Sequence, residues 1–242
     1  MSNNDSTKKV ILIGLSGCSS TGKTTLAKLA SQFLPNSVLI HEDDFYKHDE
    51  EVPMNTKYGI RDWDSPEALN LLLFKKELNI IKNTGQIATK LIHNNNVDNI
   101  SKFALSESFL EELSLKTQSI DDKYNLVIVD GFMLYNNNDI SSEFDLRLFI
   151  RAPYKTLKKR RDSRNGYQTL DSFWVDPPYY FDEFVYKSYE ENHKSLFQNE
   201  DVEGKLTTQA AKEIRDFNND DGVSIEESLS WVIDQIASFC KD

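Results

Sequence analysis

One stretch of the sequence has the residue types and spacing of a phosphate-binding loop. Residues 17–24 read Gly-Cys-Ser-Ser-Thr-Gly-Lys-Thr and match the pattern Gly-x4-Gly-Lys-Ser/Thr at every fixed position. The glycines let successive backbone N–H groups turn toward phosphate oxygens, Lys23 can reach the β- and γ-phosphates, and the Thr24 hydroxyl can ligate Mg2+. A glycine-rich turn shaped for a dinucleotide is the alternative. The complete match favours a site for a nucleoside triphosphate with magnesium.

Two acidic residues follow apolar segments, at the positions where parallel strands would end. Asp130 closes the run Leu126–Val129, and Asp43 comes shortly after Val38–Ile40. Because phosphates bind at the carboxyl edge of a parallel sheet, Asp130 can hold Mg2+ directly or through water. Asp43 can face the γ-phosphate from the other side and accept a hydroxyl proton during phosphoryl transfer. The alternatives are acids in solvated turns, and Asp44 is the next candidate for the base.

A cationic segment follows the fourth apolar run of the chain. Arginines brought over a transferring phosphate would stabilise its negative charge and exclude water. A solvated face or a nucleic-acid contact is the alternative for such a run. Its position after a strand and the acidity of the whole chain favour a lid over residues 153–180. The segment contains Lys155, Lys158, Lys159, Arg160, Arg161 and Arg164.

The apolar pattern alternates between strand-like and helix-like segments. Continuous runs at 10–13, 38–40, 124–130 and 146–150 predict buried parallel strands, with amphipathic helical spacing between them. This alternation indicates an α/β fold with helices on both faces of a parallel sheet.

Short signals predict where the helices begin and end. A helix that starts at Ser65 with the stripe Leu69, Leu72 and Leu73 ends at Gly85. A basic helix is predicted from residue 153 to about 164. Residues 86–120 are expected to be an irregular insert with one short helix, and no element is predicted for residues 199–222. Two further helix starts are marked by capping boxes, Ser108 with Glu111 and Ser224 with Glu227.

The composition is that of a globular, acidic protein. The 242 residues carry a net charge of −11, which opposes binding to nucleic acid. The two cysteines, Cys18 and Cys240, and the four histidines have no metal-ligand spacing. No apolar run is long enough for a bilayer or a signal peptide. We expect a single, monomeric, cytoplasmic domain, 1–242, whose partners are small molecules rather than nucleic acid or membrane.

Several segments together resemble a known family. They are Gly17–Thr24, Asp43–Lys47, Trp63–Leu69, Asp130–Phe132, and Arg160–Arg164 followed by Tyr167-Gln168. This set resembles the nicotinamide riboside kinases, most closely the fungal members, over most of residues 8–198. The family lies in the uridine kinase-like branch of the P-loop kinases. The resemblance implies a P-loop kinase fold with a basic lid, and transfer of phosphate from ATP with Mg2+ to the 5′-hydroxyl of a riboside.

The resemblance also implies roles for the matching positions. Asp43 would be the general base, with Lys23 and Arg161 as the other catalytic residues, and Thr24, Asp43 and Asp130 would hold the metal. ATP would contact Gly17, Cys18, Ser19, Ser20, Thr21, Gly22, Lys23, Thr24, Thr25, Arg160 and Arg164. The riboside would contact Asp43, Asp44, Phe45, Tyr46, Trp63, Asp64, Arg161, Tyr167 and Gln168.

The physics of the ring favours one riboside over another. The pyridinium of nicotinamide riboside carries a positive charge, which an aromatic face such as Trp63 attracts, and Tyr167 could cover the other side. The Asp64 carboxylate can accept hydrogen bonds from a ribose diol. We therefore expect nicotinamide riboside, and nicotinic acid riboside as well, to be the substrates, in the formation of NAD. A uridine–cytidine kinase is the alternative, and a nucleotide-dependent switch or binding module is the alternative without catalysis.

Overall fold

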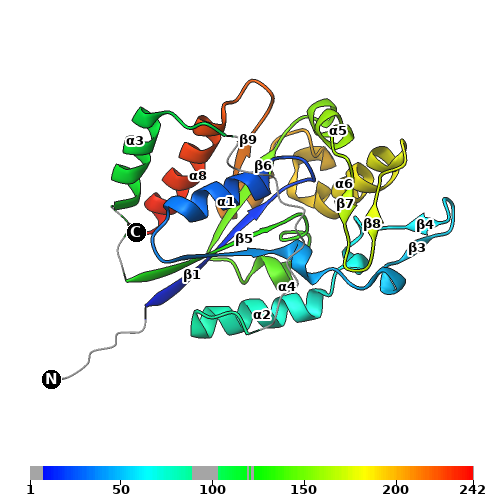
Figure 1. Cartoon of the computed structure of the whole chain (residues 1–242), viewed down its shortest axis with the longest axis horizontal. Helices are drawn as coiled ribbons and strands as arrows, with labels where there is room; N and C mark the ends of the chain where they lie inside the picture. The colour runs from blue at the N-terminus through cyan, green and yellow to red at the C-terminus, as the bar shows by residue number, and fades with distance from the viewer. Residues whose placement is uncertain (1–7, 89–102, 119, 121–122, 242) are drawn as a thin grey trace.

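A five-stranded sheet forms the centre of the computed structural model, which describes residues 8–88, 103–118, 120 and 123–241 (Figure 1). Its strand order is β2-β5-β1-β6-β9, and every neighbouring pair is parallel. The predicted α/β class with a parallel sheet is confirmed. The strands are β1 (Lys9–Ser16), β2 (Ser37–His41), β5 (Tyr124–Gly131), β6 (Leu146–Arg151) and β9 (Ile214–Asn218).

Helices cover both faces of this sheet because successive side chains of a strand point to opposite sides. Ile11, Ile13 and Leu15 of β1 belong to the core under one group of helices, whereas Leu12 belongs to the core on the other face. Figure 1 shows the two layers. The first contains α1 (Lys23–Phe33), α3 (Glu107–Gln118) and α8 (Ile225–Phe239), and the second contains α2 (Leu71–Thr84), α4 (Asn138–Ser141) and α6 (Lys187–His193).

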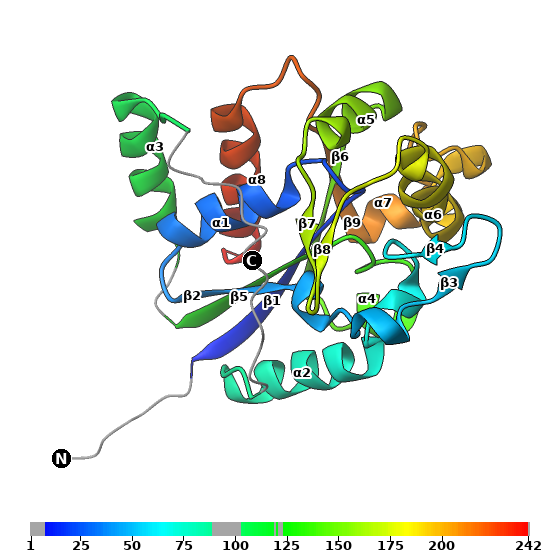
Figure 2. The same cartoon turned by 45° about the vertical axis from the view of Figure 1, so that its right-hand side comes forward.

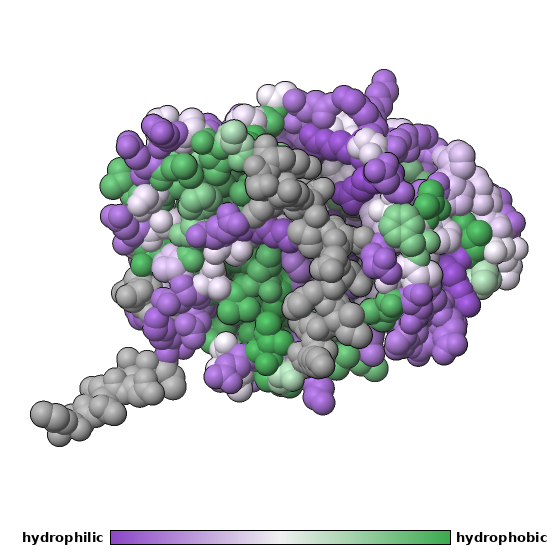
Figure 3. Space-filling view, in the orientation of Figure 1, coloured by the Kyte–Doolittle hydropathy of each residue, from purple (hydrophilic) through white to green (hydrophobic). Residues whose placement is uncertain are grey.

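The remaining elements lie around the carboxyl edge of the sheet, except for α7, which directly precedes β9 at the amino edge. Helix α5 and a small hairpin, β7–β8, occupy the stretch that the sequence predicts to be a lid (Figure 2). The surface over α5, at the upper right of Figure 3, is strongly hydrophilic. Within the described residues no helix is long and apolar enough to cross a membrane. The elements are β3 (Met54–Asn55), β4 (Ile60–Arg61), α5 (Tyr154–Asp162), β7 (Tyr167–Gln168), β8 (Phe173–Trp174) and α7 (Ala210–Glu213).

The start predicted for the helix over residues 65–85 is wrong. Ser65 and Pro66 begin only a short 3-10 turn, and α2 starts at Leu71 after Asn70, whose side chain accepts a hydrogen bond from the Leu73 backbone N–H at 3.1 Å. The buried stripe is also shifted, because Leu72 is 85% exposed while Phe74, Leu78 and Ile81 are buried. Gly85 ends the helix in the left-handed conformation, as predicted.

The insert is more regular than the sequence indicates. Helix α3 occupies 107–118, so the predicted capping box at Ser108 is wrong, and the hydroxyl of Ser106 accepts from the Phe109 N–H instead. The helix packs on α8, where Lys116 pairs with Asp234 at 2.9 Å. The rest of the insert, 89–102 and 119, lies outside the described residues.

Strand β9 is the strand of the central sheet that the sequence analysis missed. It reads Ile-Arg-Asp-Phe-Asn and forms the edge of the sheet beside β6. Its polar composition suits an edge strand, which is only half covered. The capping signal that follows it is confirmed, since the Ser224 hydroxyl accepts from the Glu227 N–H at 3.1 Å and α8 begins at Ile225.

Candidate active site

A pocket of about 810 Å³ lies at the carboxyl edge of the sheet. The loop after β1, the turn after β2, the lid and the segment after β9 all contribute to its walls. It brings together most of the side chains assigned from the sequence. The assigned residues that line the pocket are Ser19, Ser20, Gly22, Lys23, Thr24, Thr25, Asp43, Tyr46, Trp63, Asp64, Arg160, Arg161, Arg164, Tyr167 and Gln168.

The loop after β1 has the backbone that a phosphate cradle needs. Gly17 has φ +150°, and a Cβ there would lie 2.1 Å from the Ile150 carbonyl oxygen, so a side chain is excluded. Gly22 has φ +91°, and α1 begins at the next residue with its N-terminal N–H groups at the pocket. The thiol of Cys18 is turned into the core, and burial raises its pKa to about 12. The part that Cys18 can offer a phosphate is therefore its backbone.

The predicted metal residues Thr24 and Asp130 meet directly. The Thr24 hydroxyl donates to Asp130 Oδ2 at 2.5 Å, and Asp130 is 4% exposed. His41, which the sequence analysis left out of the site, contacts the other carboxylate oxygen through Nδ1. Burial lowers the pKa of His41, but the hydrogen bond to Asp130 and the charges of Asp130, Asp44 and Asp43 together outweigh it and raise this pKa above its usual value.

The oxygen ligands available here suit Mg2+ better than a metal ion whose ligands all come from the protein. In the described part of the chain no three His, Cys, Asp or Glu side chains cluster as a metal site. Mg2+ usually takes one or two carboxylates and completes its shell with phosphate and water. The carboxylate of Asp130 with the Thr24 hydroxyl, and Asp43 across the pocket, provide that number of oxygen ligands.

The three acidic residues after β2 have different environments. Asp43 is open to the pocket. Glu42 is fully buried and accepts from the backbone N–H groups of Phe132 (2.8 Å) and Met133 (2.9 Å), and burial raises its pKa to about 8. Asp44 lies outside the residues that line the pocket. Of these three acids only Asp43 lines the pocket, while Glu42 ties the turn to the segment that follows β5.

The assignment of Phe45 to substrate binding is corrected. Its ring is 2% exposed and packs on Phe74 of α2 with ring centroids 4.9 Å apart. The short 3-10 turn at Glu42–Phe45 directs this side chain into the core while Tyr46 lines the pocket. The sequence motif alone does not show that the side chains of Phe45 and Tyr46 point in different directions.

Arg161 is the most heavily engaged residue of the lid. Its Nε and Nη2 donate to Asp176 at 2.6 and 3.1 Å, its Nη1 donates to the Ser19 hydroxyl at 2.8 Å, and Asp64 lies at 3.8 Å. The side chain is 7% exposed, and these partners hold its pKa above the usual value although burial opposes the charge. Arg161 therefore links the lid to the phosphate loop. Asp176, its bidentate partner, was missed because an acid in a turn carries no sequence signal.

Aromatic rings form one wall of the pocket. Tyr46 stacks with Phe132 (centroids 6.1 Å apart) and meets Trp63 edge-on (5.9 Å). One face of Tyr167 is already occupied, since the Arg161 guanidinium lies 4.1 Å from its ring centroid. Trp63, which is 8% exposed, and the half-buried Tyr46 and Trp174 also line the pocket and can contact a ring-shaped ligand.

The opposite end of the pocket contains residues that the sequence analysis did not assign. Asn219, just after β9, donates from Nδ2 to the Thr21 carbonyl at 2.7 Å and accepts from Arg160 at its own carbonyl. Phe103, Val223 and Ile225 line the pocket beside it. The missed edge strand explains the omission, because no motif marks a residue that only the sheet brings to the loop.

Comparison with curated proteins finds close relatives. Nicotinamide riboside kinase from Saccharomyces cerevisiae is 62% identical, with 97% of this chain and 99% of the relative aligned. The enzymes of that name from Eremothecium gossypii and Schizosaccharomyces pombe are 50% and 40% identical, over 96% and 95% of this chain and 95% and 97% of their own. No protein-family model matches the chain.

The environment of Asp64 predicts a pH dependence of stability. Burial raises the pKa of this carboxyl to about 6, although Arg161 opposes the rise. The folded state therefore holds the proton more tightly than the unfolded chain, and the free energy of unfolding falls as pH rises through the range from about 4 to 6. Between pH 5 and pH 7.5 the wild type should lose about 1 kcal/mol relative to Asp64→Asn, measured by urea unfolding. Equal pH slopes for the two proteins would contradict this environment.

Proposed function

The chain belongs to the nicotinamide riboside kinase family, and from that premise we propose that it transfers the γ-phosphate of ATP to the 5′-hydroxyl of nicotinamide riboside, in NAD salvage. The observation that carries the proposal is the convergence of the phosphate loop, Asp43 and the Arg161–Asp64 pair on one pocket. We extend it to nicotinic acid riboside, whose ring differs only in the substituent. Monomeric state, cytoplasmic location and the lack of nucleic-acid or membrane partners stay predictions from composition.

The donor phosphates fit the loop at the start of α1. Backbone N–H groups of residues 17–24 and the helix N-terminus supply hydrogen bonds and positive potential, and Lys23 adds a full charge at the β- and γ-phosphates. Mg2+, held by Thr24, Asp130 and Asp43, would neutralise charge on the phosphate oxygens. Arg160 and Arg164 also line the pocket.

The acceptor hydroxyl is activated from the other side. In the proposed reaction the 5′-oxygen bonds to the γ-phosphorus, the bond to the β–γ bridging oxygen breaks, and ADP leaves. The hydroxyl proton passes to Asp43, whose carboxylate is open to the pocket. Arg161 is placed between the phosphate loop and Asp64, where it can stabilise charge on the moving phosphoryl group.

The riboside fits the aromatic and acidic side of the pocket. Asp64 is buried beside Arg161 and can accept from the ribose diol. The pyridinium ring would lie against Trp63 and Tyr46, with Tyr167 and Gln168 closing from the lid. Full-length similarity to nicotinamide riboside kinases favours this reading over a uridine–cytidine kinase or a binding module without catalysis.

The base of ATP fits the opposite end, in the part of the pocket beyond Asn219. Phe103, Val223 and Ile225 form an apolar lining there. Phe103 is held in place because the adjacent segment is tied to α8, where the Ser106 N–H donates to Glu226 at 2.6 Å. A flat base stacks well on an aromatic side chain. The insert would thus contribute to donor binding.

The first prediction concerns Asp43. Asp43→Asn should lower kcat by about 10²- to 10⁴-fold, because a positioned general base contributes that much. Single-turnover measurements with saturating ATP and nicotinamide riboside provide the test. The matched control is Asp44→Asn, which changes the neighbouring acid outside the pocket and should leave the rate within a few-fold. Equal losses in the two variants would refute the assignment of the base.

A second prediction distinguishes the substrates. Trp63→Leu should lower kcat/KM for nicotinamide riboside by about 2- to 30-fold more than for uridine, since the cation–π attraction is about 0.5–2 kcal/mol. Asp64→Ala should penalise both ribosides alike. Competition kinetics with the two nucleosides measure the difference. A wild-type preference for uridine would contradict the proposal and favour the assignment as a uridine–cytidine kinase.

A third prediction tests the donor end of the pocket. Phe103→Ala should raise KM for ATP about 5-fold or more, on the order expected for one lost base–aromatic stack, with KM for the riboside unchanged. Leu115→Ala is the control, because Leu115 is an exposed apolar residue of α3 that does not line the pocket. An unchanged KM for ATP would remove Phe103 from the donor site.

A further inference from the structure

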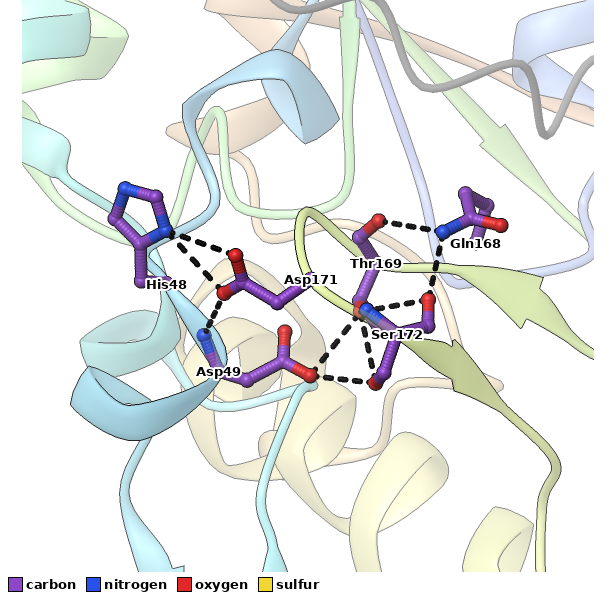
Figure 4. A network of polar contacts seen from close by, with 6 residues as sticks. All are labelled: His48, Asp49, Gln168, Thr169, Asp171 and Ser172. Carbon is purple, nitrogen blue, oxygen red and sulfur yellow. Dashed lines mark hydrogen bonds and ion pairs between the residues drawn. The ribbon is translucent and has the colours of Figure 1, made fainter.

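The tip of the lid hairpin is fastened to a segment that lies close to the proposed base. The hairpin β7–β8 turns at residues 169–172, and this turn meets His48 and Asp49, five and six residues after Asp43 (Figure 4). Figures 1 and 2 both show the hairpin running from α5 toward this segment. We call the contact, formed by His48, Asp49, Thr169, Asp171 and Ser172, the lid latch.

The latch is reciprocal, with an aspartate on each side. Asp49 Oδ2 accepts from the hydroxyls of Ser172 (2.5 Å) and Thr169 (3.2 Å). Asp171 in return accepts from the Asp49 backbone N–H at 2.9 Å, and His48 Nδ1 lies 3.2 Å from both of its carboxylate oxygens. Each carboxylate therefore bridges two groups of the other segment, so that neither segment can move without breaking several hydrogen bonds.

The hairpin has little else to hold its tip. Each strand is two residues long, and the two strands form only two cross-strand residue pairs. Phe173 and the adjacent Val175 are 59% and 60% exposed, whereas Trp174 packs on Tyr180 with ring centroids 5.3 Å apart, so this ring contact is at the base of the hairpin rather than at its tip. A two-stranded hairpin of this size is marginal on its own. The hairpin is therefore held at its base by the Arg161–Asp176 pair and by the packing of Trp174 on Tyr180, and at its tip by the latch.

Strand β7 and the first residue of the turn that follows it contribute to the pocket. Tyr167, Gln168 and Thr169 line it, and Gln168 Nε2 donates to the Ser172 carbonyl at 2.8 Å, which joins the lining to the latched tip. Thr169 itself serves both purposes, because its hydroxyl also contacts Asp49. Displacement of the tip would therefore displace the side chains that close over the riboside end.

We propose that Asp49 and Asp171 are positioning residues that hold the lid closed over the riboside. The inference rests on the proposed function for the identity of the substrate, but the latch itself does not depend on it. Because the latch acts on Tyr167 and Gln168 and leaves the phosphate loop untouched, its loss selectively weakens retention of the riboside. ATP binding, at the other end of the pocket, is preserved.

The test compares Asp49→Ala with Glu50→Ala. Glu50 is the exposed neighbouring acid in the same turn, and its side chain makes none of the latch contacts. Asp49→Ala should lower kcat/KM for the riboside about 10-fold or more, through KM, with KM for ATP and the melting temperature unchanged. Asp49→Asn retains an acceptor oxygen and should recover part of the loss. Equal rises in both KM values, or a loss that tracks the melting temperature, would overturn the proposal.

Two further measurements separate the latch from the activity. Hydrogen exchange of the amides in 167–174 should accelerate in Asp49→Ala and in Ser172→Ala, and this result requires no turnover. The double variant should resemble Asp49→Ala, because that substitution already removes the bond between Asp49 and Ser172. Unchanged exchange would refute the latch. Faster exchange in an enzyme that phosphorylates no riboside would refute the proposed function alone.

Discussion

A buried guanidinium is the interaction on which the rest of the site depends. Arg161 is removed from water, and an isolated charge there would be strongly unfavourable, so it must keep its partners. Those partners come from three places in the chain: Ser19 in the phosphate loop, Asp64 before α2, and Asp176 at the base of the lid hairpin. The requirement to pair one charge therefore joins the phosphate loop, the segment before α2 and the lid in a single arrangement.

The two ends of the lid differ in how firmly they are attached. At α5, Arg160 donates to the Asn219 carbonyl and Lys159 pairs with Asp221, so the helix is tied to the segment after β9. Toward its tip the lid becomes a hairpin whose two strands are each two residues long, with exposed apolar side chains. Regions with few buried contacts open at low free energy. Loss of the latch would therefore free the tip while α5 stays tied to the segment after β9.

Burial of acids in the site has a cost in stability that the fold sustains. Glu42 is fully buried and Asp64 is 6% exposed, and burial raises both pKa values, to about 8 and about 6. Two backbone N–H groups from the end of β5 partly compensate for Glu42, and Arg161 for Asp64. Sites built for chemistry commonly carry such local costs, because rigid placement of polar groups requires their desolvation.

Local patterns in the sequence were enough to predict four of the five strands of the parallel sheet, the phosphate loop and most of the residues that line the pocket. Apolar runs predict buried strands, and the spacing from Gly17 to Thr24 defines the loop. Tertiary structure alone decided which side chains face the pocket: Phe45 packs in the core, whereas Asp176, Phe103 and Asn219 reach the site from distant segments. The physical reason is that β9 is a polar edge strand and the lid turn is held by pairing across the fold, so neither leaves a periodic signal in its own residues.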